Sequence, residues 1–448
     1  MALIRITKGH DIPIAGRPQP RIIDAPRPAR VALQPADFRY LRPRLLVAEG
    51  DSVKTGAPVL EDKDDPRIRF VSPGTGKIAS VHYGERRRIL EVIIELSGEE
   101  QFLDNPPMTR EEVLGLDRFA LKNKLLQSGL WPLIRQRPFS KIASPDDMPS
   151  AILINGMPAD PFDADPGAFL SGMEESFQLG IEIISRLTDG KTHLCCAAGA
   201  SHKAFTQAAH CLRHEIAGPY PAGLPAVQIY HVCPPKAGEV VWYISAQDVA
   251  AIADYFTAGK YPTQRIVSLC GPSVLNPTYL RTRQGACAES LSDGRVQEGE
   301  QRYVTGGVLT GRKIAATGFL GFYDSMLFVL PEGRTREFLG FLHPGHDRYS
   351  ASRAFLSTLF PKATRLIDTN KHGSVRNFVL NSAYEDICPV DILPQFLAKS
   401  VLAGDIEESE KHGILDCAEC GLCTFACPSK IELGRIIRKG IDDIRNEG

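Results

Sequence analysis

The feature that most constrains this chain is a run of four cysteines close to its end. From residue 417 the sequence reads Cys-Ala-Glu-Cys-Gly-Leu-Cys-Thr-Phe-Ala-Cys-Pro, which is the C-x2-C-x2-C-x3-C-P spacing of bacterial iron–sulfur proteins. Thiolates at this spacing can face one cube of iron and sulfide, and the proline turns the chain away behind the last of them. Because C-x2-C is also zinc spacing, a zinc knuckle is the alternative. The run therefore predicts a metal site in the C-terminal part.

A fifth cysteine, Cys388, also precedes a proline. It bears on which four cysteines bind the cluster. In two-cluster ferredoxin modules the fourth cysteine of each run binds the other cluster, so three adjacent cysteines need a remote partner before a proline. The positions where the other cysteines of its run would stand hold Phe378, Asn381 and Tyr384. One cluster is therefore predicted to be retained and one lost. The predicted ligands are Cys388, Cys417, Cys420 and Cys423. Cys427 is the alternative fourth ligand, if the local run binds alone.

Composition bounds the class of protein. A chain of 448 residues has room for about three or four domains. Apolar residues make up 43% and charged residues 23%, as in ordinary globular proteins, and a net charge of -1 gives no reason to expect nucleic acid as a partner. We find no secretory signal and no apolar run near the roughly 18 to 20 residues that cross a bilayer. Eleven cysteines in such a chain suggest a reducing compartment.

Patterns along the chain predict a multidomain α/β plus β protein of four parts. Residues 1–105 contain an E-G-D-x-V-x-x-G hairpin followed by S-P-G-T-G-x-I, which resembles the barrel-sandwich hybrid of biotinyl and lipoyl domains. Residues 106–262 alternate helical and strand-like stretches, as a Rossmann-like α/β domain with a mainly parallel sheet does. Residues 263–335 read as a small β-rich module that resembles β-grasp or SLBB domains. Residues 336–448 are expected to be mostly helical and to hold the ferredoxin-type cysteines.

The second part carries the more specific predictions of secondary structure. We expect one amphipathic helix from Thr109 to Gln127, and strands at 227–232 and 240–244. The thiols of Cys195 and Cys196 should point to opposite faces of a strand, which favours a structural role. No glycine-rich loop suited to cradling a nucleotide phosphate is found in this part.

Short phrases spread over the chain carry a closer resemblance. They are Ile6-Thr-Lys-Gly-His-Asp-Ile-Pro-Ile-Ala-Gly, Ser128-Gly-Leu-Trp, Arg137-Pro-Phe-Ser-Lys, Pro221-Ala-Gly-Leu and Phe319-Leu-Gly-Phe-Tyr-Asp. With the domain order, they make the chain similar over nearly its full length to the A subunits of the bacterial Na+-translocating NADH:quinone reductases. That family is related to the C subunit of the Rnf complex and to the NADH-binding flavoprotein subunit of complex I.

The resemblance implies a translocase subunit, not a complete enzyme, that binds ubiquinone or menaquinone. It implies a peripheral position on the cytoplasmic face of the bacterial inner membrane, with five partner subunits through which the chain contacts the membrane. The whole complex would couple NADH oxidation and quinone reduction to Na+ export. The alternatives are an Rnf-type electron-transfer subunit, or a non-redox scaffold subunit. The family pattern does not necessarily keep Cys417 and Cys420, so the complete run here indicates a retained 4Fe–4S cluster or a branch closer to Rnf.

The loop after Ser128 distinguishes the chain from flavin-binding relatives. In the Rnf and complex I relatives this place holds a glycine-rich loop that lets the flavin phosphate approach the backbone. Bulky side chains and two prolines replace it here, so we expect neither FMN nor NADH to bind. A quinone needs a flat apolar slot with one or two hydrogen-bond donors. The candidate contacts are Trp131, Arg135, Arg137, Phe139 and Lys141. Packing of this loop on a neighbouring subunit is the alternative.

Overall fold

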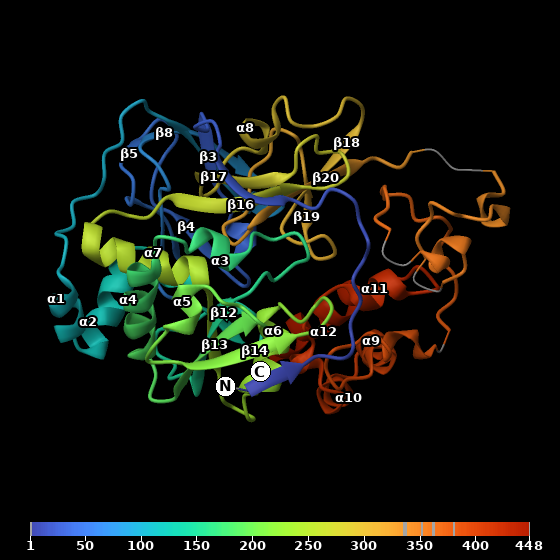
Figure 1. The fold of residues 1–448 in the computed structure, drawn as a ribbon. Coiled ribbons are helices and arrows are strands. Elements are labelled where there is room, and N and C mark those ends of the chain that lie inside the picture. The colour runs from blue at the N-terminus through green and yellow to red at the C-terminus, as the bar shows by residue number, and fades with distance from the viewer. Residues whose placement is uncertain (1, 335–337, 351–352, 361–362, 380, 448) are drawn as a thin grey trace.

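A computed structural model of the chain describes residues 2–334, 338–350, 353–360, 363–379 and 381–447. Its largest sheet has seven strands in the order β1-β14-β13-β12-β15-β10-β11 (Figure 1). Neighbours from β1 to β15 are parallel, and β10 and β11 add an antiparallel edge. The strand bounds are Ala2–Arg5 (β1), Arg135–Arg137 (β10), Lys141–Ile142 (β11), Ala151–Gly156 (β12), Lys191–Ala197 (β13), Leu212–Ala217 (β14) and Val241–Ser245 (β15).

Helices cover both faces of this sheet. Cys196 packs with Ile152 and with helices α4 (Glu174–Ser185) and α7 (Ala246–Ala258). Cys195 packs on the other face, with α6 (Pro225–Val232). The two thiols therefore point to opposite faces, as predicted, and both are part of hydrophobic cores.

Two predictions of secondary structure in this region were wrong. Residues 227–232 belong to helix α6, because Pro225 at the first helical position supplies a helix start that outweighs the β-branched residues. The helix expected from Thr109 to Gln127 is two helices, α1 (Arg110–Gly115) and α2 (Arg118–Gln127). The Asp117 side chain accepts a hydrogen bond from the Ala120 N–H and caps a second start. The strand expected at 240–244 is β15.

The other sheets lie above the parallel sheet in the view of Figure 1. Two small sheets, β3-β9-β8-β5 and β4-β6-β7, form the N-terminal sandwich, and a third has the order β19-β18-β20-β16-β17-β2. The sandwich strands are Arg30–Leu33 (β3), Pro43–Leu45 (β4), Ser52–Val53 (β5), Pro58–Asp62 (β6), Arg69–Val71 (β7), Gly76–Tyr83 (β8) and Ile89–Leu96 (β9). The third sheet contains Gln19–Asp24 (β2), Gln264–Cys270 (β16), Thr278–Arg283 (β17), Gln301–Thr305 (β18), Arg312–Ile314 (β19) and Met326–Pro331 (β20).

The first two strands leave the N-terminal sandwich. Strand β1 pairs with β14 at the edge of the parallel sheet, and β2 pairs with β17 in the third sheet. Short helices complete these parts of the fold: α3 (Pro166–Phe169), α5 (Lys203–Thr206) and α8 (Ala288–Ser292). The N-terminal segment thus ties three parts of the chain together.

The C-terminal part is helical only from residue 394 onward. Between 338 and 393 the described residues form three short 3-10 turns and irregular chain, so the expectation of a mostly helical segment from 336 was wrong there, where many Gly, Pro and polar residues interrupt the pattern. The predicted boundary at 335/336 lies outside the described residues. The helices are Pro394–Ala403 (α9), Ile406–Lys411 (α10), Leu422–Ala426 (α11) and Leu433–Glu447 (α12).

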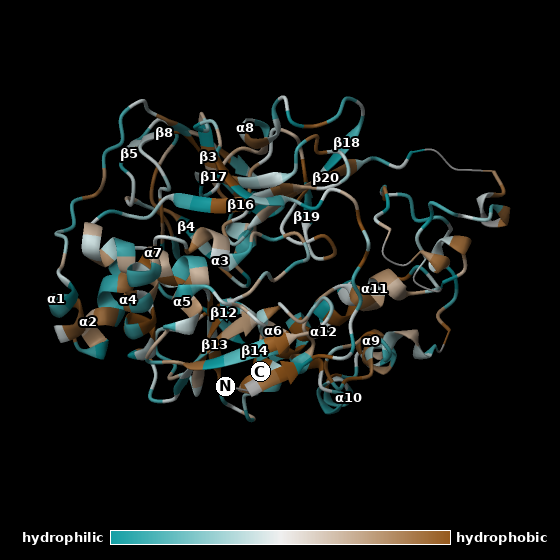
Figure 2. Ribbon diagram, viewed as in Figure 1, coloured by the Kyte–Doolittle hydropathy of each residue, from teal (hydrophilic) through white to brown (hydrophobic). Residues whose placement is uncertain are grey.

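Helix α12 organises this part. Its buried residues Leu433, Ile437, Gly440, Ile441 and Ile444 form one stripe at helical spacing. They contribute to a hydrophobic cluster, here called the C-terminal core, consisting of Val390, Ile392, Leu397, Ile414, Ile437, Ile441 and Ile444. Figure 2 shows α10 as largely hydrophilic, in agreement with its sequence Ile-Glu-Glu-Ser-Glu-Lys.

Candidate functional site

The predicted quinone loop folds between the parallel sheet and the C-terminal helices. Its first aromatic residue, Trp131, is fully buried. The Trp131 indole N–H donates to the Ala143 carbonyl at 2.8 Å, and its ring meets Trp242 edge-on at 5.4 Å. This ring is therefore part of the domain core.

Phe139 follows in a backbone conformation that bulky residues rarely adopt, with φ of 77°. Its carbonyl accepts a hydrogen bond from Arg39 at 2.9 Å, and its side chain packs against the C-terminal core. Backbone strain of this kind concentrates at functional sites. The loop is thus held in one specific shape against the C-terminal helices.

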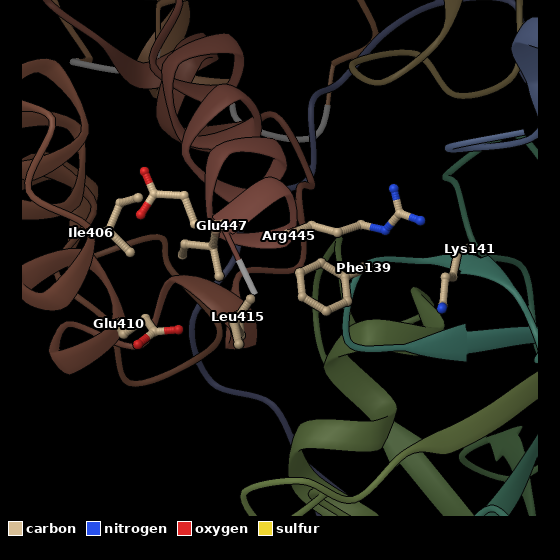
Figure 3. A pocket seen from close by; sticks show the side chains of 8 residues that line it. Phe139, Lys141, Ile406, Glu410, Leu415, Arg445 and Glu447 are labelled. Atoms are coloured by element: carbon tan, nitrogen blue, oxygen red, sulfur yellow. The ribbon is translucent and has the colours of Figure 1, made fainter. Parts of the chain in front are cut away.

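Phe139 and Lys141 line a pocket of about 490 Å3, here called the apolar pocket. Helices α10 and α12 and the segment before the cysteines supply the other walls. The remaining lining residues are Ile406, Glu410, Leu415, Ile444, Arg445 and Glu447. Figure 3 shows Arg445 extending toward the side where Phe139 and Lys141 lie, while Ile406, Glu410 and Glu447 lie on the other side. Four of the eight lining residues are apolar and four are charged, a combination that can hold a ring-shaped ligand and orient its polar groups.

The charged groups of the apolar pocket affect one another. Burial lowers the pKa of Lys141, and the nearby Arg445 guanidinium lowers it further. The Arg445 guanidinium lies 3.8 Å from the centre of the Tyr40 ring, and the Tyr40 hydroxyl donates to Asp442 at 2.7 Å. Arg445 is thereby positioned at the pocket by an aromatic residue of the N-terminal part.

A larger hollow, here called the polar cleft, lies on the other side of the loop. It holds about 540 Å3 and is lined by Arg135 of the predicted quinone contacts. Arg135 is held between two aromatic rings, 4.7 Å from the centre of Tyr243 and 4.3 Å from that of Tyr323. The cleft is lined by five aspartates, Asp37, Asp160, Asp163, Asp248 and Asp324.

Burial affects the protonation of two aspartates of the polar cleft, Asp37 and Asp163. Burial raises the pKa of Asp37 to about 7, and the Asp324 carboxylate raises it further. Burial also raises the pKa of Asp163 to about 6, and the nearby Asp324 carboxylate adds to this rise. Hydrogen bonds from Ser325 and from the Asp160 N–H favour the ionised form of Asp163 and oppose the rise. The two hollows therefore differ in charge as well as in size.

One carboxylate joins the quinone loop to the cysteine loop. Glu419 accepts two hydrogen bonds from Arg39, at 2.8 and 2.7 Å, and one from Arg438 at 3.0 Å. The Arg137 guanidinium lies 3.8 Å from the same carboxylate and donates to the carbonyls of Leu415 and Cys417, the latter at 3.0 Å. Both Arg137 and Glu419 are largely buried. Arg137 therefore holds the cysteine loop and lines neither of the two hollows.

The predicted metal ligands come together beside this anchor. The side chains of Cys388, Cys417 and Cys423 all pack against the C-terminal core. Cys420 belongs to the same group, since its neighbours Cys423 and Cys388 help burial to raise its pKa to about 12. Its carbonyl accepts a 2.7 Å hydrogen bond from the Tyr220 hydroxyl. Four half-buried thiols are therefore gathered at one place.

Cys427, the alternative ligand, lies in a different environment. It is buried in a small cluster with Tyr384, Ala398 and Leu433, against which Phe378 also packs. Its sulfur lies 3.2 Å from the Tyr384 hydroxyl. Within the described residues, no three His, Cys, Asp or Glu side chains converge closely enough to hold a single metal ion.

Several residues of this junction were missed from the sequence. Tyr40, Arg39, Glu419 and Arg445 contact the predicted loop, yet Arg39 and Glu419 lie 380 positions apart. The sequence around these residues gives one local signal: Arg438 and Arg445 are seven residues apart on α12 and therefore lie on one helical face. This spacing does not identify a binding site, because a solvent-exposed helix face shows the same pattern.

Comparisons with known proteins agree along the whole chain. The NqrA N-terminal barrel-sandwich hybrid domain matches residues 4–97, the NqrA second alpha/beta domain matches 116–261, and the NQRA C-terminal domain matches 266–316. The chain is similar to the A subunit of the Na(+)-translocating NADH-quinone reductase of Yersinia pseudotuberculosis serotype O:1b (strain IP 31758), with 40% identity over 449 residues, covering 100% of both chains.

Other relatives with the same name give the same result. The A subunit of Serratia proteamaculans (strain 568) is 40% identical and that of Pasteurella multocida (strain Pm70) 38% identical, each over 100% of both chains. A solved NAD+-reducing [NiFe]-hydrogenase chain aligns over 76% of this chain and 63% of its own, at 12% identity and a TM-score of 0.38, a distance at which nothing about function follows. Among the described residues, no helix is long and apolar enough to cross a membrane.

Proposed function

The chain belongs to the NqrA family, the A subunits of the Na(+)-translocating NADH-quinone reductases, and from this premise we propose that it binds quinone for the complex in the apolar pocket. In this proposal the protein lies on the cytoplasmic face of the inner membrane. Five partner subunits connect it to the membrane, and the complex couples NADH oxidation and quinone reduction to Na+ export. The quinone is ubiquinone or menaquinone.

The observation that carries the proposal is the meeting of Phe139 and Lys141 in one pocket with the C-terminal helices. A volume of about 490 Å3 is within the range of small-molecule sites. The Phe139 ring and the aliphatic side chains of Leu415 and Ile444 offer flat apolar contacts. The Lys141 ammonium and the Arg445 guanidinium offer donors to the two carbonyl oxygens of a quinone.

The five predicted contacts take different parts in this proposal. Phe139 and Lys141 touch the quinone. Arg137 and Trp131 support the loop, because the Arg137 guanidinium is committed to backbone carbonyls and the Trp131 ring is enclosed by the core. Arg135 faces the polar cleft and is assigned no quinone contact.

We expect no FMN at this loop. The residues that replace the glycines, Trp131, Leu133 and Ile134, are at most 3% exposed, so a flavin phosphate would have to displace packed side chains to reach the backbone. Tight binding of FMN or NADH to the purified chain would contradict this expectation and favour the Rnf-type alternative. Quinone binding at the apolar pocket does not depend on a cluster at the cysteines.

Calorimetric titration of the purified full-length chain with a short-chain ubiquinone tests the proposal. We expect saturable binding, with Kd raised roughly tenfold by Lys141→Met, which removes a charged donor, and raised by a similar factor by Phe139→Ala. Phe119→Ala is the matched control, since Phe119 is 69% exposed on α2. Thermal unfolding of each variant verifies that it is folded. No binding to the wild-type chain, or equal binding by both variants, would overturn the proposal and favour a scaffold role.

A further inference from the structure

We propose that Cys388, Cys417, Cys420 and Cys423 bind one 4Fe–4S cluster, and that Cys427 marks a second ferredoxin-like site that aromatic side chains now fill. Nothing in the family relationship assigns a metal to this chain. The proposal goes beyond quinone binding and stands on the cysteine loop itself.

The first thiol of the loop receives a backbone hydrogen bond, because the Glu419 N–H donates to the Cys417 sulfur at 3.5 Å. A backbone donor aimed at a sulfur atom stabilises negative charge there, and such donors are among the features that tune iron–sulfur clusters. The turn that follows Cys417 therefore suits a thiolate.

The thiols come from two separate segments of the chain. Cys388 precedes α9, whereas Cys417 and Cys423 follow α10, and all three side chains pack against the C-terminal core. An iron–sulfur cube is a core that thiolates from two segments can share.

The order of the cysteines along the chain favours a cluster over zinc. Three cysteines at C-x2-C-x2-C spacing with a remote Cys-Pro form the ligand pattern of one cluster in a two-cluster ferredoxin module. A structural zinc site shares only the C-x2-C spacing with this pattern.

The second ferredoxin-like position is closed. Phe378 and Tyr384 occupy the places of two cysteines in the lost run, and both side chains pack around Cys427, with their ring centres 6.4 Å apart. The Cys427 sulfur is engaged by the Tyr384 hydroxyl at 3.2 Å and by the Ile431 N–H at 3.4 Å. The cysteine that the lost cluster would have used is therefore a core residue.

Gly421 shows how closely the loop is fitted to the rest of the chain. It adopts φ of 78°, and a Cβ there would lie 2.9 Å from the Leu309 carbonyl oxygen. Leu415, two residues before the first loop cysteine, lines the apolar pocket. The proposed cluster thus lies beside the proposed quinone, within one hydrophobic core.

Iron and acid-labile sulfide analysis of the full-length chain, purified or reconstituted without oxygen, tests the inference. We expect about four irons per chain and a visible absorbance that dithionite bleaches. Cys388→Ser and Cys420→Ser should lose most of the iron. Cys427→Ser should keep it, as should the control Cys211→Ser, whose half-buried thiol lies outside the C-terminal part. Circular dichroism of each variant verifies folding.

Three results would overturn the inference. Loss of iron in Cys427→Ser with retention in Cys388→Ser would show that the local run binds alone. One zinc ion per wild-type chain would show a mononuclear site. Absence of iron after reconstitution of the folded wild-type chain would show that the thiols hold no cluster. None of these results depends on quinone affinity, so the two proposals fail separately.

Discussion

The apolar pocket and the polar cleft lie on either side of the same short loop, and their linings differ in character. Phe139 and Lys141 face a pocket with four apolar and four charged lining residues, whereas Arg135 and Ser140 face a cleft that is lined by five aspartates. Neighbouring residues of one loop therefore serve two different environments. The comparison teaches that the loop's composition, mixed in charge and aromatic content, reflects two surfaces and not one site.

Glu419 lines the polar cleft and joins the quinone loop to the cysteine loop, so removing it should have the largest effect. Glu419→Ala leaves Arg39 and Arg137 without their largely buried counter-charge, and such a loss costs about 3 to 5 kcal/mol. We expect a lower free energy of unfolding in urea and faster proteolysis of the C-terminal helices.

Glu410→Ala is the matched control on the apolar side, because Glu410 is exposed at the rim of that pocket. Its effect should stay within about 0.5 kcal/mol. Equal effects of the two substitutions would contradict the anchoring role of Glu419.

A substitution in α12 should affect the apolar side alone. A Cβ on Gly440 would lie 2.3 Å from Val401 Cγ2 and 2.8 Å from Ile414 Cδ1, where α9 and α12 approach closely. Overpacking costs about 1 to 3 kcal/mol, and the better helix propensity of alanine returns about 1 kcal/mol. Gly440→Ala should therefore lower the melting temperature and weaken quinone binding.

Gly434→Ala in the same helix is the control. A Cβ at Gly434 meets only the Thr424 hydroxyl within 4 Å, at 3.2 Å, so this change should be neutral or slightly stabilising. If both glycine variants melt alike, close packing of α9 on α12 does not shape the pocket.

A substitution confined to the polar cleft should change how the free energy of unfolding depends on pH. At a fixed pH its effect on stability should be the smallest of the three. The pKa of Asp163 is raised to about 6 from its ordinary value of 3.8, so the folded chain binds more protons than the unfolded chain between these values. The free energy of unfolding contributed by Asp163 is therefore present at low pH and is lost as the pH rises through about 6.

Asp163→Asn should remove this dependence, so its stability relative to wild type should increase as the pH rises from about 4 to about 7. Urea denaturation at several pH values measures the difference. Quinone affinity should not change, because Asp163 is absent from the lining of the apolar pocket. A pH-independent difference, or a changed quinone affinity, would break the separation of the two hollows.

These residues also show how far sequence reasoning reaches. The spacing rule for paired cysteine runs groups Cys388 with Cys417, Cys420 and Cys423, because it encodes a three-dimensional arrangement in local spacing. The side chains of Cys388, Cys417 and Cys423 pack against one core, and their role as ligands stays a prediction. No such rule exists for Trp131, whose burial depends on Trp242 more than a hundred residues away. The Arg39–Glu419 pair likewise depends on tertiary packing alone.

Local signals failed where two of them competed. The apolar run 227–232 is as compatible with a strand as with a helix until Pro225 is counted as a helix start. Asp117 caps the start of a second helix within a continuous apolar pattern. In both cases the deciding residue lies at a helix start and is not part of the periodicity.

The paths of β1 and β2 have a consequence for how the chain is made. Ala2 pairs with His214, and Gln19 pairs with Thr278, so this segment is translated long before its pairing partners. Until then the N-terminal strand has unpaired backbone groups, which are a target for chaperones and for other nascent chains. Strands β1 and β2 are thus synthesised early and pair late.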